Sequence, residues 1–363
     1  MTPFVSATLD TAALRHNLAI VRARAPRSRV MAVIKANAYG HGLVAVAQAL
    51  DETDAFAVAR VDEGLALRTA GISKPIVLLE GVFEAEQLQL AAANRFGLVV
   101  HIEEQVRLLE QAPAGADFEV WLKLDSGMNR LGLKAKKFAA AHAALASLSG
   151  VRQPVGLMSH LASAEARDDP ENARQLERFA QATKGMTGAR SLSNSAALLN
   201  FPEAQADWVR PGLLLYGVSP LPGTLGAGLG LEPVMTLHSR IIALKDVARG
   251  ERVGYGGAWT ASRPTRLAIA AVGYGDGYPR NLPSGSAVLV NGASARIAGK
   301  VSMDMIGIDV TDLPKPARLG DPVVLWGPGL PVERVAAAAG TISYELLCGI
   351  SQRVAINARR IPS

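Results

Sequence analysis

Short apolar runs alternate with longer amphipathic stretches from residue 30 to about residue 216. An apolar run of four to eight residues bounded by turn residues is typical of a buried strand. Eight such runs are predicted to be strands: VMAVIK (30–35), AFAVAR (55–60), PIVLLE (75–80), GLVVH (97–101), FEVWLKLD (118–125), PVGLMSH (154–160), ARSLSN (189–194) and DWVRPGLLLYG (207–217).

The stretches between these runs have helical spacing. Phe138, Ala141, Leu145 and Leu148, for example, would lie on one face of a helix. Eight strand–helix units in succession favour a closed (β/α)8 barrel of the TIM type over an open doubly wound sheet.

The pattern changes after the Gly/Pro-rich segment 221–233, which is predicted to be a linker. Short β-rich runs bounded by Gly, Pro or Asp follow, and they predict a second domain that is mainly β. These runs are 234–244, 266–272, 286–292, 295–301, 305–310 and 322–327. Residues 332–351 are predicted to form two short helices. A chain of 363 residues is long enough for two domains, placed at 1–228 and 229–363.

Composition narrows the class of protein. The 38 basic and 32 acidic residues give a net charge of +6, but the basic residues are scattered, which disfavours a nucleic-acid partner. A single cysteine, Cys348, excludes an intrachain disulfide and any multi-cysteine metal site. The N-terminus lacks a signal-peptide pattern, and no apolar segment approaches the ~18 residues of a membrane span. We therefore expect a cytoplasmic enzyme with no metal and no membrane contact.

Polar side chains follow the predicted strands at the point where each strand ends. In a (β/α)8 barrel, functional groups collect at this C-terminal face. The side chains concerned are Lys35, Lys123, Asp125, His160, Ser193, Asn194 and Arg210. Their shared position in successive units predicts one converging site.

Lys35 is the most informative of these residues. A lysine held against apolar walls has its charged form disfavoured, and the free amine can condense with a carbonyl group. Schiff-base chemistry is one interpretation. The other is that the lysine stem passes the strand end and places its ammonium in water. This segment alone leaves both open.

Nine segments in order resemble the bacterial alanine racemases, enzymes of the fold type III group that depend on pyridoxal 5'-phosphate. They are AVIKANAYGHG (32–42), KLDSGMNRLG (123–132), MSHLASA (158–164), SNSAA (193–197), RPGLLLYG (210–217), VGYGGAW (253–259), VGYGDGYPR (272–280), GKVSMDM (299–305) and TISYE (341–345). The resemblance implies interconversion of L-alanine and D-alanine by a homodimer.

The resemblance implies that Lys35 holds the cofactor covalently and acts as the acid/base group on one face of the substrate. Racemisation needs a second group on the opposite face. By resemblance this group is Tyr255, which would reach in from the other subunit. Standing alone, the Tyr255 segment would more readily be interpreted as a core or turn tyrosine.

The resemblance also implies a set of cofactor contacts. Arg210 would face the pyridine nitrogen, and because a guanidinium only donates, the ring would stay unprotonated. His160 would pack beside the ring. Neutral groups would hold the phosphate: Tyr39, Ser195, Gly212, Leu213 and Tyr344, with Asn194 beside them. Asn194 is equally well explained as a helix N-cap, and Arg210 alone as the partner of a carboxylate.

Substrate contacts follow from the same resemblance. Arg130 would meet the substrate carboxylate, and Lys123 would carry a carbamate that orients this arginine. Without the carbamate the two cations would repel each other. Tyr274 and Tyr344 would narrow the entrance, and the Met303 backbone would donate to the carboxylate, with Tyr274 and Met303 coming from the partner chain. A small side chain such as that of alanine is implied.

Two alternative functions stay open at this point. A non-catalytic carrier of pyridoxal 5'-phosphate shares the lysine segment but lacks the second domain. An amino-acid decarboxylase shares both domains but requires a protonated pyridine, set by a carboxylate where this chain has Arg210. For a racemase, D-alanine would serve either peptidoglycan synthesis or alanine breakdown.

Overall fold

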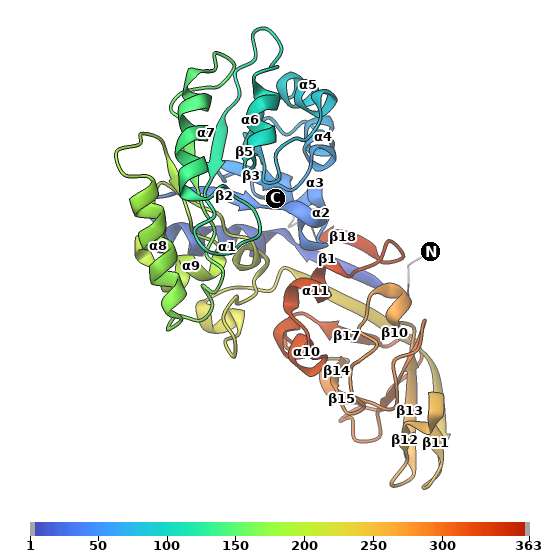
Figure 1. The fold of residues 1–363 in the computed structure, drawn as a ribbon. Coiled ribbons are helices and arrows are strands. Elements are labelled where there is room, and N and C mark those ends of the chain that lie inside the picture. The colour runs from blue at the N-terminus through green and yellow to red at the C-terminus, as the bar shows by residue number, and fades with distance from the viewer. Residues whose placement is uncertain (1–3, 360–363) are drawn as a thin grey trace.

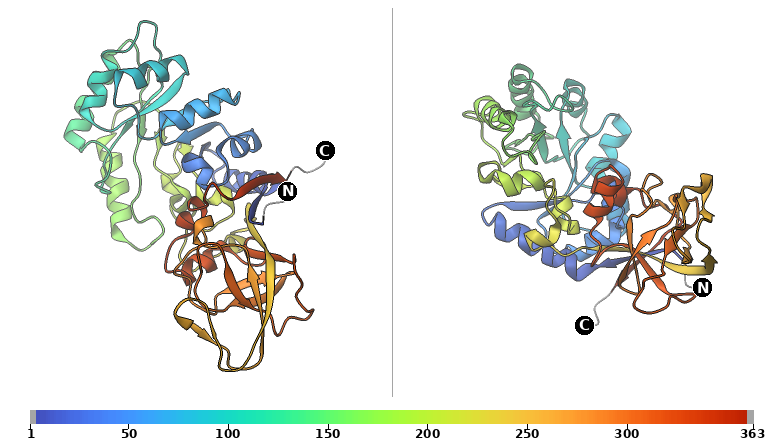
Figure 2. Two further views of the ribbon diagram at one scale, coloured as in Figure 1. Left: turned by 90° about the vertical axis from the view of Figure 1, so that its right-hand side faces the viewer. Right: turned by 90° about the horizontal axis from the view of Figure 1, so that it is seen from below.

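The computed structural model describes residues 4–359 and consists of two lobes (Figure 1). The larger lobe is a barrel of parallel strands surrounded by helices, and the smaller lobe consists mostly of antiparallel strands. The two lobes lie side by side in three views (Figures 1 and 2). Residues 1–3 and 360–363 of the two predicted domains lie outside the described part.

The larger lobe confirms the predicted barrel. Its strands pair in the order β8-β7-β6-β5-β4-β3-β2-β9, and all seven ladders are parallel. The strands are β2 (Arg29–Val33), β3 (Ala55–Val58), β4 (Ile76–Leu78), β5 (Phe96–Val100), β6 (Val120–Lys123), β7 (Gly156–Met158), β8 (Arg190–Ser191) and β9 (Trp208–Val209). The amide of Arg210 donates to the Ser193 carbonyl at 2.9 Å, which brings the two edge strands together.

Helices cover the outside of this barrel. In α7, the predicted face of Phe138, Ala141 and Leu145 is buried. The helices are α1 (Thr11–Arg24), α3 (Leu43–Ala49), α4 (Val61–Thr69), α5 (Ala85–Ala93), α6 (Glu103–Leu109), α7 (Ala135–Ser147), α8 (Pro170–Ala182) and α9 (Ser195–Asn200), with the 3-10 turns η1 (Pro202–Ala204) and η3 (Gly226–Leu229).

The eighth strand is shorter than predicted. β9 ends at Val209, and the apolar residues of the run form a 3-10 turn, η2 (Leu213–Tyr216), instead of a strand. Pro211 has no N–H to donate to a ladder, and Gly217 closes the turn with φ of 81°. The last barrel strand therefore ends at Val209, directly before the predicted site residues Arg210, Gly212 and Leu213.

The smaller lobe confirms the predicted β-rich domain. Its eight-stranded sheet has the order β13-β16-β15-β14-β17-β10-β1-β18, and an additional β13–β10 pairing closes six of the strands into a ring. The strands are β1 (Ser6–Asp10), β10 (Met235–Val247), β13 (Thr265–Ala270), β14 (Ala287–Val290), β15 (Ala293–Ile297), β16 (Ile306–Asp309), β17 (Pro322–Trp326) and β18 (Ala355–Arg359). The two predicted helices are α10 (Val332–Ala338) and α11 (Ser343–Cys348).

β1 belongs to the smaller lobe although it precedes the barrel in the sequence. It pairs antiparallel with β10 and parallel with β18. The predicted boundary at residue 228 does not anticipate this pairing, because a five-residue strand carries no signal of its distant partners. The division into 1–228 and 229–363 otherwise stays a prediction.

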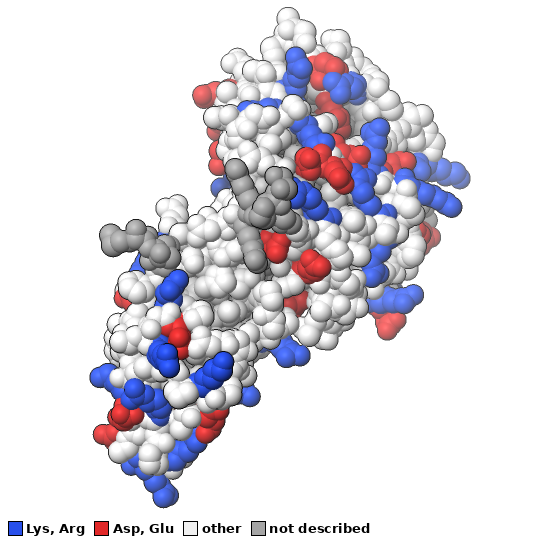
Figure 3. Space-filling view, turned by 180° about the vertical axis from the view of Figure 1, so that it is seen from behind, with Lys and Arg blue, Asp and Glu red and all other residues white. Residues whose placement is uncertain are grey.

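The surface shows no large area of one charge on the face drawn in Figure 3, where basic and acidic side chains intermingle on both lobes. Within residues 4–359, no helix is long and apolar enough to cross a membrane.

Candidate functional site

The cationic residues predicted to converge do lie together at the C-terminal ends of the barrel strands. Lys35 follows β2, Lys123 is the last residue of β6, and Arg210 follows β9. The charges of these residues interact. Arg210, Arg130 and Lys35 each lower the pKa of Lys123. The barrel therefore brings these positive charges close enough to one another to interact.

The chain leaves β2 through an unusual backbone. Ala36, Asn37, Ala38 and Tyr39 have φ of 54°, 53°, 53° and 51°, so the short segment α2 (Lys35–Tyr39) is a left-handed turn. Each L-residue in this conformation costs roughly 1–2 kcal/mol. Such strain persists only where the surroundings enforce it, and it clusters at functional sites.

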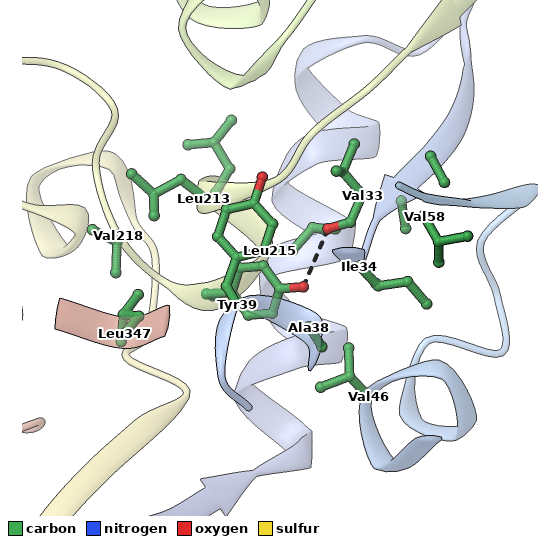
Figure 4. Packing of buried hydrophobic residues seen from close by; sticks show 14 of the residues in the cluster. Val33, Ile34, Ala38, Tyr39, Val46, Val58, Leu213, Leu215, Val218 and Leu347 are labelled. Atoms are coloured by element: carbon green, nitrogen blue, oxygen red, sulfur yellow. Dashed lines mark hydrogen bonds between the residues drawn. The ribbon is translucent and has the colours of Figure 1, made fainter. Parts of the chain in front are cut away.

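Aromatic packing supports the left-handed turn. The Tyr39 ring lies 4.8 Å from that of Tyr216 and 5.7 Å from that of Tyr344. The Tyr216 hydroxyl donates to the Val33 carbonyl at 3.2 Å, the dashed line in Figure 4. Burial raises the pKa of Tyr39 above its usual range, so its hydroxyl is a neutral hydrogen-bonding group.

His41 secures the end of the same turn. Its Nδ1 lies 2.8 Å from the Tyr39 carbonyl and 3.0 Å from that of Ala38, and because carbonyls only accept, Nδ1 carries the proton. Burial lowers the pKa of His41 to about 4. The ring is thus a neutral donor that ties two carbonyls of the strained segment.

Arg210 is buried and faces neutral oxygens. It donates to the Ser191 hydroxyl at 2.5 Å and to the Ser159 carbonyl at 2.7 Å. Among the described residues, no carboxylate forms an ion pair with it, so the carboxylate partner considered for Arg210 alone is wrong. Burial lowers the pKa of Arg210 to about 10, which leaves it charged at neutral pH. An unpaired buried cation favours an anionic or electron-rich ligand.

His160 lies between Arg210 and Asn194. Its Nδ1 is 3.3 Å from Nη2 of Arg210, and its Nε2 is 3.4 Å from Nδ2 of Asn194. Burial, and then the charge of Arg210, keep the pKa of His160 well below its usual range. Asn194 also accepts from the Ala197 amide at 2.9 Å, as the predicted N-cap of α9.

Neutral polar groups gather beside Tyr39, after the ends of β8 and β9. The Ser195 hydroxyl accepts from the amide of Gly212 at 2.9 Å and from that of Leu214 at 3.4 Å. A Cβ added at Gly212 would lie 2.4 Å from the Tyr39 hydroxyl, so glycine is required for this approach. Hydroxyls and backbone amides in this arrangement suit a phosphate.

Lys123 begins the loop that carries Arg130. The ends of this loop are joined, because the Leu133 amide donates to the Lys123 carbonyl at 2.9 Å. Asp125 accepts from Lys134 at 2.7 Å within it. Burial, and then the charges of Arg210, Arg130 and Lys35, lower the pKa of Lys123 to about 8. Lys123 is therefore still mostly charged at pH 7, but a larger share of it is neutral, nucleophilic amine than in an ordinary lysine.

His101 was not predicted as a site residue. It follows β5, and the register that pairs Val100 with Leu122 places it opposite Lys123. Its Nε2 lies 3.0 Å from the Glu80 carbonyl, while its buried Nδ1 has no partner within the described residues. The sequence contains a signal for this residue. His101 is the last residue of the predicted strand GLVVH, just as Lys123 is the last residue of the neighbouring strand β6.

The residues predicted to come from a partner do not meet Lys35 in one chain. Tyr255 begins the 3-10 turn η4 (Tyr255–Gly257) between β11 (Arg252–Val253) and β12 (Trp259–Thr260), at the end of the smaller lobe far from the barrel (Figure 1). Its side chain is 69% exposed. Tyr274, in η5 (Tyr274–Asp276), and Met303 are exposed as well, at 41% and 53%.

The fold and this geometry define a class: a barrel enzyme whose site carries a lysine amine, an unpaired buried arginine and neutral phosphate-type donors. Within residues 4–359, no group of three or more His, Cys, Asp or Glu side chains could hold a metal ion. Because Lys35, Lys123 and Arg210 are cationic, the site suits an anionic organic cofactor.

Comparison with known proteins names the family. The model of the alanine racemase N-terminal domain matches residues 9–220, and that of the alanine racemase C-terminal domain matches residues 234–358. The chain belongs to the alanine racemase family. An alanine racemase of Aeromonas hydrophila is 49% identical over 352 residues, covering 96% of this chain and 97% of that protein. One of Nitrosococcus oceani is 51% identical over 352 residues, covering 97% and 98%.

Solved structures agree. The crystal structure of the biosynthetic alanine racemase of Pseudomonas aeruginosa superimposes with a TM-score of 0.95 at 47% identity, and the match covers 99% of this chain and 100% of that one. The alanine racemase of Acinetobacter baumannii gives a TM-score of 0.92 at 38% identity, with coverage of 99% and 100%.

Proposed function

We propose that this protein racemises alanine with pyridoxal 5'-phosphate as its cofactor. The observation that carries the proposal is the buried Arg210, which is held by neutral oxygens and whose charge, like that of Lys35, acts on Lys123. Lys35 would bind the cofactor covalently, and Arg210 would donate to its ring nitrogen. Its phosphate would be held by Tyr39, Ser195, Gly212, Leu213 and Tyr344, the neutral groups described above.

The bound cofactor would stabilise negative charge at the α-carbon of the amino acid. The chain's own residues would move the proton. Lys35 would act on one face of that carbon, and Tyr255 of the partner subunit would act on the other. Arg130 would hold the substrate carboxylate, with help from the partner subunit's Met303, and the partner subunit's Tyr274 would narrow the entrance beside Tyr344.

A homodimer is required by this proposal, and the exposed side chains of the smaller lobe support it. Besides Tyr255, Tyr274 and Met303, Met305 is 47% exposed and Ile242 is 39% exposed. Large apolar side chains exposed in several places on one lobe favour an interaction surface. We infer that the partner subunit covers these side chains and that Tyr255 of each subunit reaches into the site of the other.

The pKa of Lys123 supports its predicted modification. Its neutral amine would attack carbon dioxide: an N–C bond would form, one C=O π bond would open to leave the charge on oxygen, and the nitrogen would release one proton to solvent. The product is an anion, which would turn repulsion from Arg130 and Arg210 into attraction. We propose that the carbamate orients Arg130.

The alternatives are less well supported. A carrier that consists of one barrel does not account for the match to the C-terminal domain model at residues 234–358. A decarboxylase needs a carboxylate, to keep the pyridine protonated, at the position where this chain has Arg210. We place the racemase in the cytoplasm, where D-alanine would feed peptidoglycan synthesis or alanine breakdown.

The test combines two measurements on the purified protein. The first is the visible absorption of pyridoxal 5'-phosphate bound to Lys35, and the second is an enantiomer-resolved alanine assay in both directions. Carbon dioxide release without inversion would identify a decarboxylase instead. Lys35→Ala and Tyr255→Ala homodimers should both be inactive, and mixing them should restore part of the activity through hybrid sites. No recovery despite demonstrated subunit exchange would refute the shared site.

A further inference from the structure

The carboxylate of Glu63, on α4, joins the lysine segment to the neighbouring barrel strand. Its Oε1 accepts from the Ala36 amide at 2.6 Å, directly after Lys35. Its Oε2 accepts from the Ala59 amide at 2.8 Å, directly after β3. Both oxygens are thus used, each by a backbone donor at the C-terminal end of a strand.

This bridge lies where regular pairing stops. The Ile34 amide still donates to the Ala57 carbonyl at 2.9 Å, the last ladder bond between β2 and β3. The four left-handed residues begin at Ala36. Beyond this last bond, Glu63 links the two strands through its side chain, because it accepts from one amide after each strand. It also fixes the amide of Ala36, the first residue of the strained turn.

Two other helices of the same barrel provide an internal comparison. Each carries a glutamine at the position that Glu63 occupies, the third residue of the helix. Gln87 of α5 accepts from the Phe83 amide at 2.9 Å, and Gln105 of α6 accepts from the His101 amide at 2.9 Å. These bonds correspond to that between Glu63 and Ala59.

The other terminal atom of each side chain explains why residue 63 is a glutamate and residue 105 is a glutamine. Nε2 of Gln105 donates to the Glu80 carbonyl at 2.9 Å, because the neighbouring strand presents an acceptor there. At α4 the neighbouring strand presents a donor, the Ala36 N–H. A glutamine at residue 63 would have to direct its NH2 group at one of the two N–H donors. Only a carboxylate satisfies both.

We propose that Glu63 is a positioning residue for Lys35: its carboxylate fixes the left-handed turn, and the turn aims the lysine amine into the site. Glu63 itself moves no proton. This inference rests on the proposed function for what Lys35 does, but the structural part, order in residues 35–42, is independent of it.

The experiment compares Glu63→Gln with wild type and with Gln87→Ala, a matched control that removes a cap at the equivalent position of α5. Amide hydrogen exchange of residues 35–42 is followed by mass spectrometry on the full-length protein with its cofactor. The loss of one charge-assisted hydrogen bond should raise the exchange rate about tenfold in E63Q. It should not change in Q87A.

The second readout is catalytic. E63Q should lose about tenfold in kcat/KM for alanine and show altered absorption of the cofactor at Lys35, whereas Q87A should keep both. Glu63→Asp retains the charge but is one methylene too short to bridge, so it should shift both readouts in the same direction if E63Q fails to fold.

Unchanged exchange in E63Q and E63D would overturn the proposal, and so would faster exchange with wild-type kcat/KM and absorption. A wild-type protein that does not racemise alanine would refute the proposed function instead, while the exchange comparison would still test the bridge.

Discussion

Lys123→Met tests the electrostatics of the site through protein stability. Burial and the charges of Arg210, Arg130 and Lys35 lower the pKa of Lys123 from 10.5 to about 8. At about 1.36 kcal/mol per pH unit, holding this ammonium in the folded protein at pH 7 costs roughly 3 kcal/mol. Methionine keeps the apolar stem without the charge. We therefore expect the free energy of unfolding at pH 7 to rise by about 2–3 kcal/mol.

The sign depends on pH. Between pH 8 and 10.5 the unfolded chain binds more protons at Lys123 than the folded one, so the stability contributed by the wild-type residue rises with pH. The advantage of the methionine variant should therefore be largest at pH 7 and shrink steadily above pH 8.

Urea unfolding measures this difference at pH 7, 8 and 9.5 in buffer free of carbon dioxide. The protein concentration is held constant, because the proposed dimer would contribute to stability. The exposed Lys136→Met is the matched control and should change stability little. Added bicarbonate should stabilise wild type and leave Lys123→Met unaffected if the carbamate forms. A variant that is less stable than wild type at pH 7, or a difference that does not shrink with pH, refutes the reasoning.

Gly40→Ala and Gly212→Ala test the contacts of the left-handed turn, and Gly71→Ala is the control for the first. Gly40→Ala should cost about 3 kcal/mol in urea unfolding, because its Cβ would lie 2.0 Å from the Leu347 carbonyl oxygen at φ of 76°; Gly71→Ala, at φ of 82° with nothing within 4 Å, should cost only about 1 kcal/mol. Equal losses would contradict this packing. Gly212→Ala should displace the Tyr39 hydroxyl and weaken pyridoxal 5'-phosphate binding at least tenfold by titration; unchanged affinity would exclude this phosphate cradle.

The barrel was predictable because its signals are local. Each strand is a short apolar run, and each helix has its own periodicity, so eight repeated units define the topology. β1 and β18 gave no comparable signal. SATLD and AINAR are five-residue segments at opposite ends of the sequence, and only their pairing in space makes them strands.

The cationic site was predictable from the strand ends, because the C-terminal ends of parallel strands meet on one face of a barrel. The left-handed turn was not predictable. Alanine favours right-handed helix, and two of the four residues concerned are alanines, so tertiary contacts with Tyr216 and Glu63 override local preference. Glu63 was missed because the N-cap of α4 is Arg60, not the Ser or Thr of a capping box.

The pairing of β1 with β10 and β18 has a consequence for synthesis. β1 leaves the ribosome before the barrel, whereas its partners β10 and β18 emerge only after the barrel. The barrel can begin to fold while its covalent neighbour β1 still has exposed edges. Completion of the eight-stranded sheet therefore waits for β18. A nascent chain that stops before Ala355 would therefore leave one edge of β1 unpaired, because β18 is the strand that covers it.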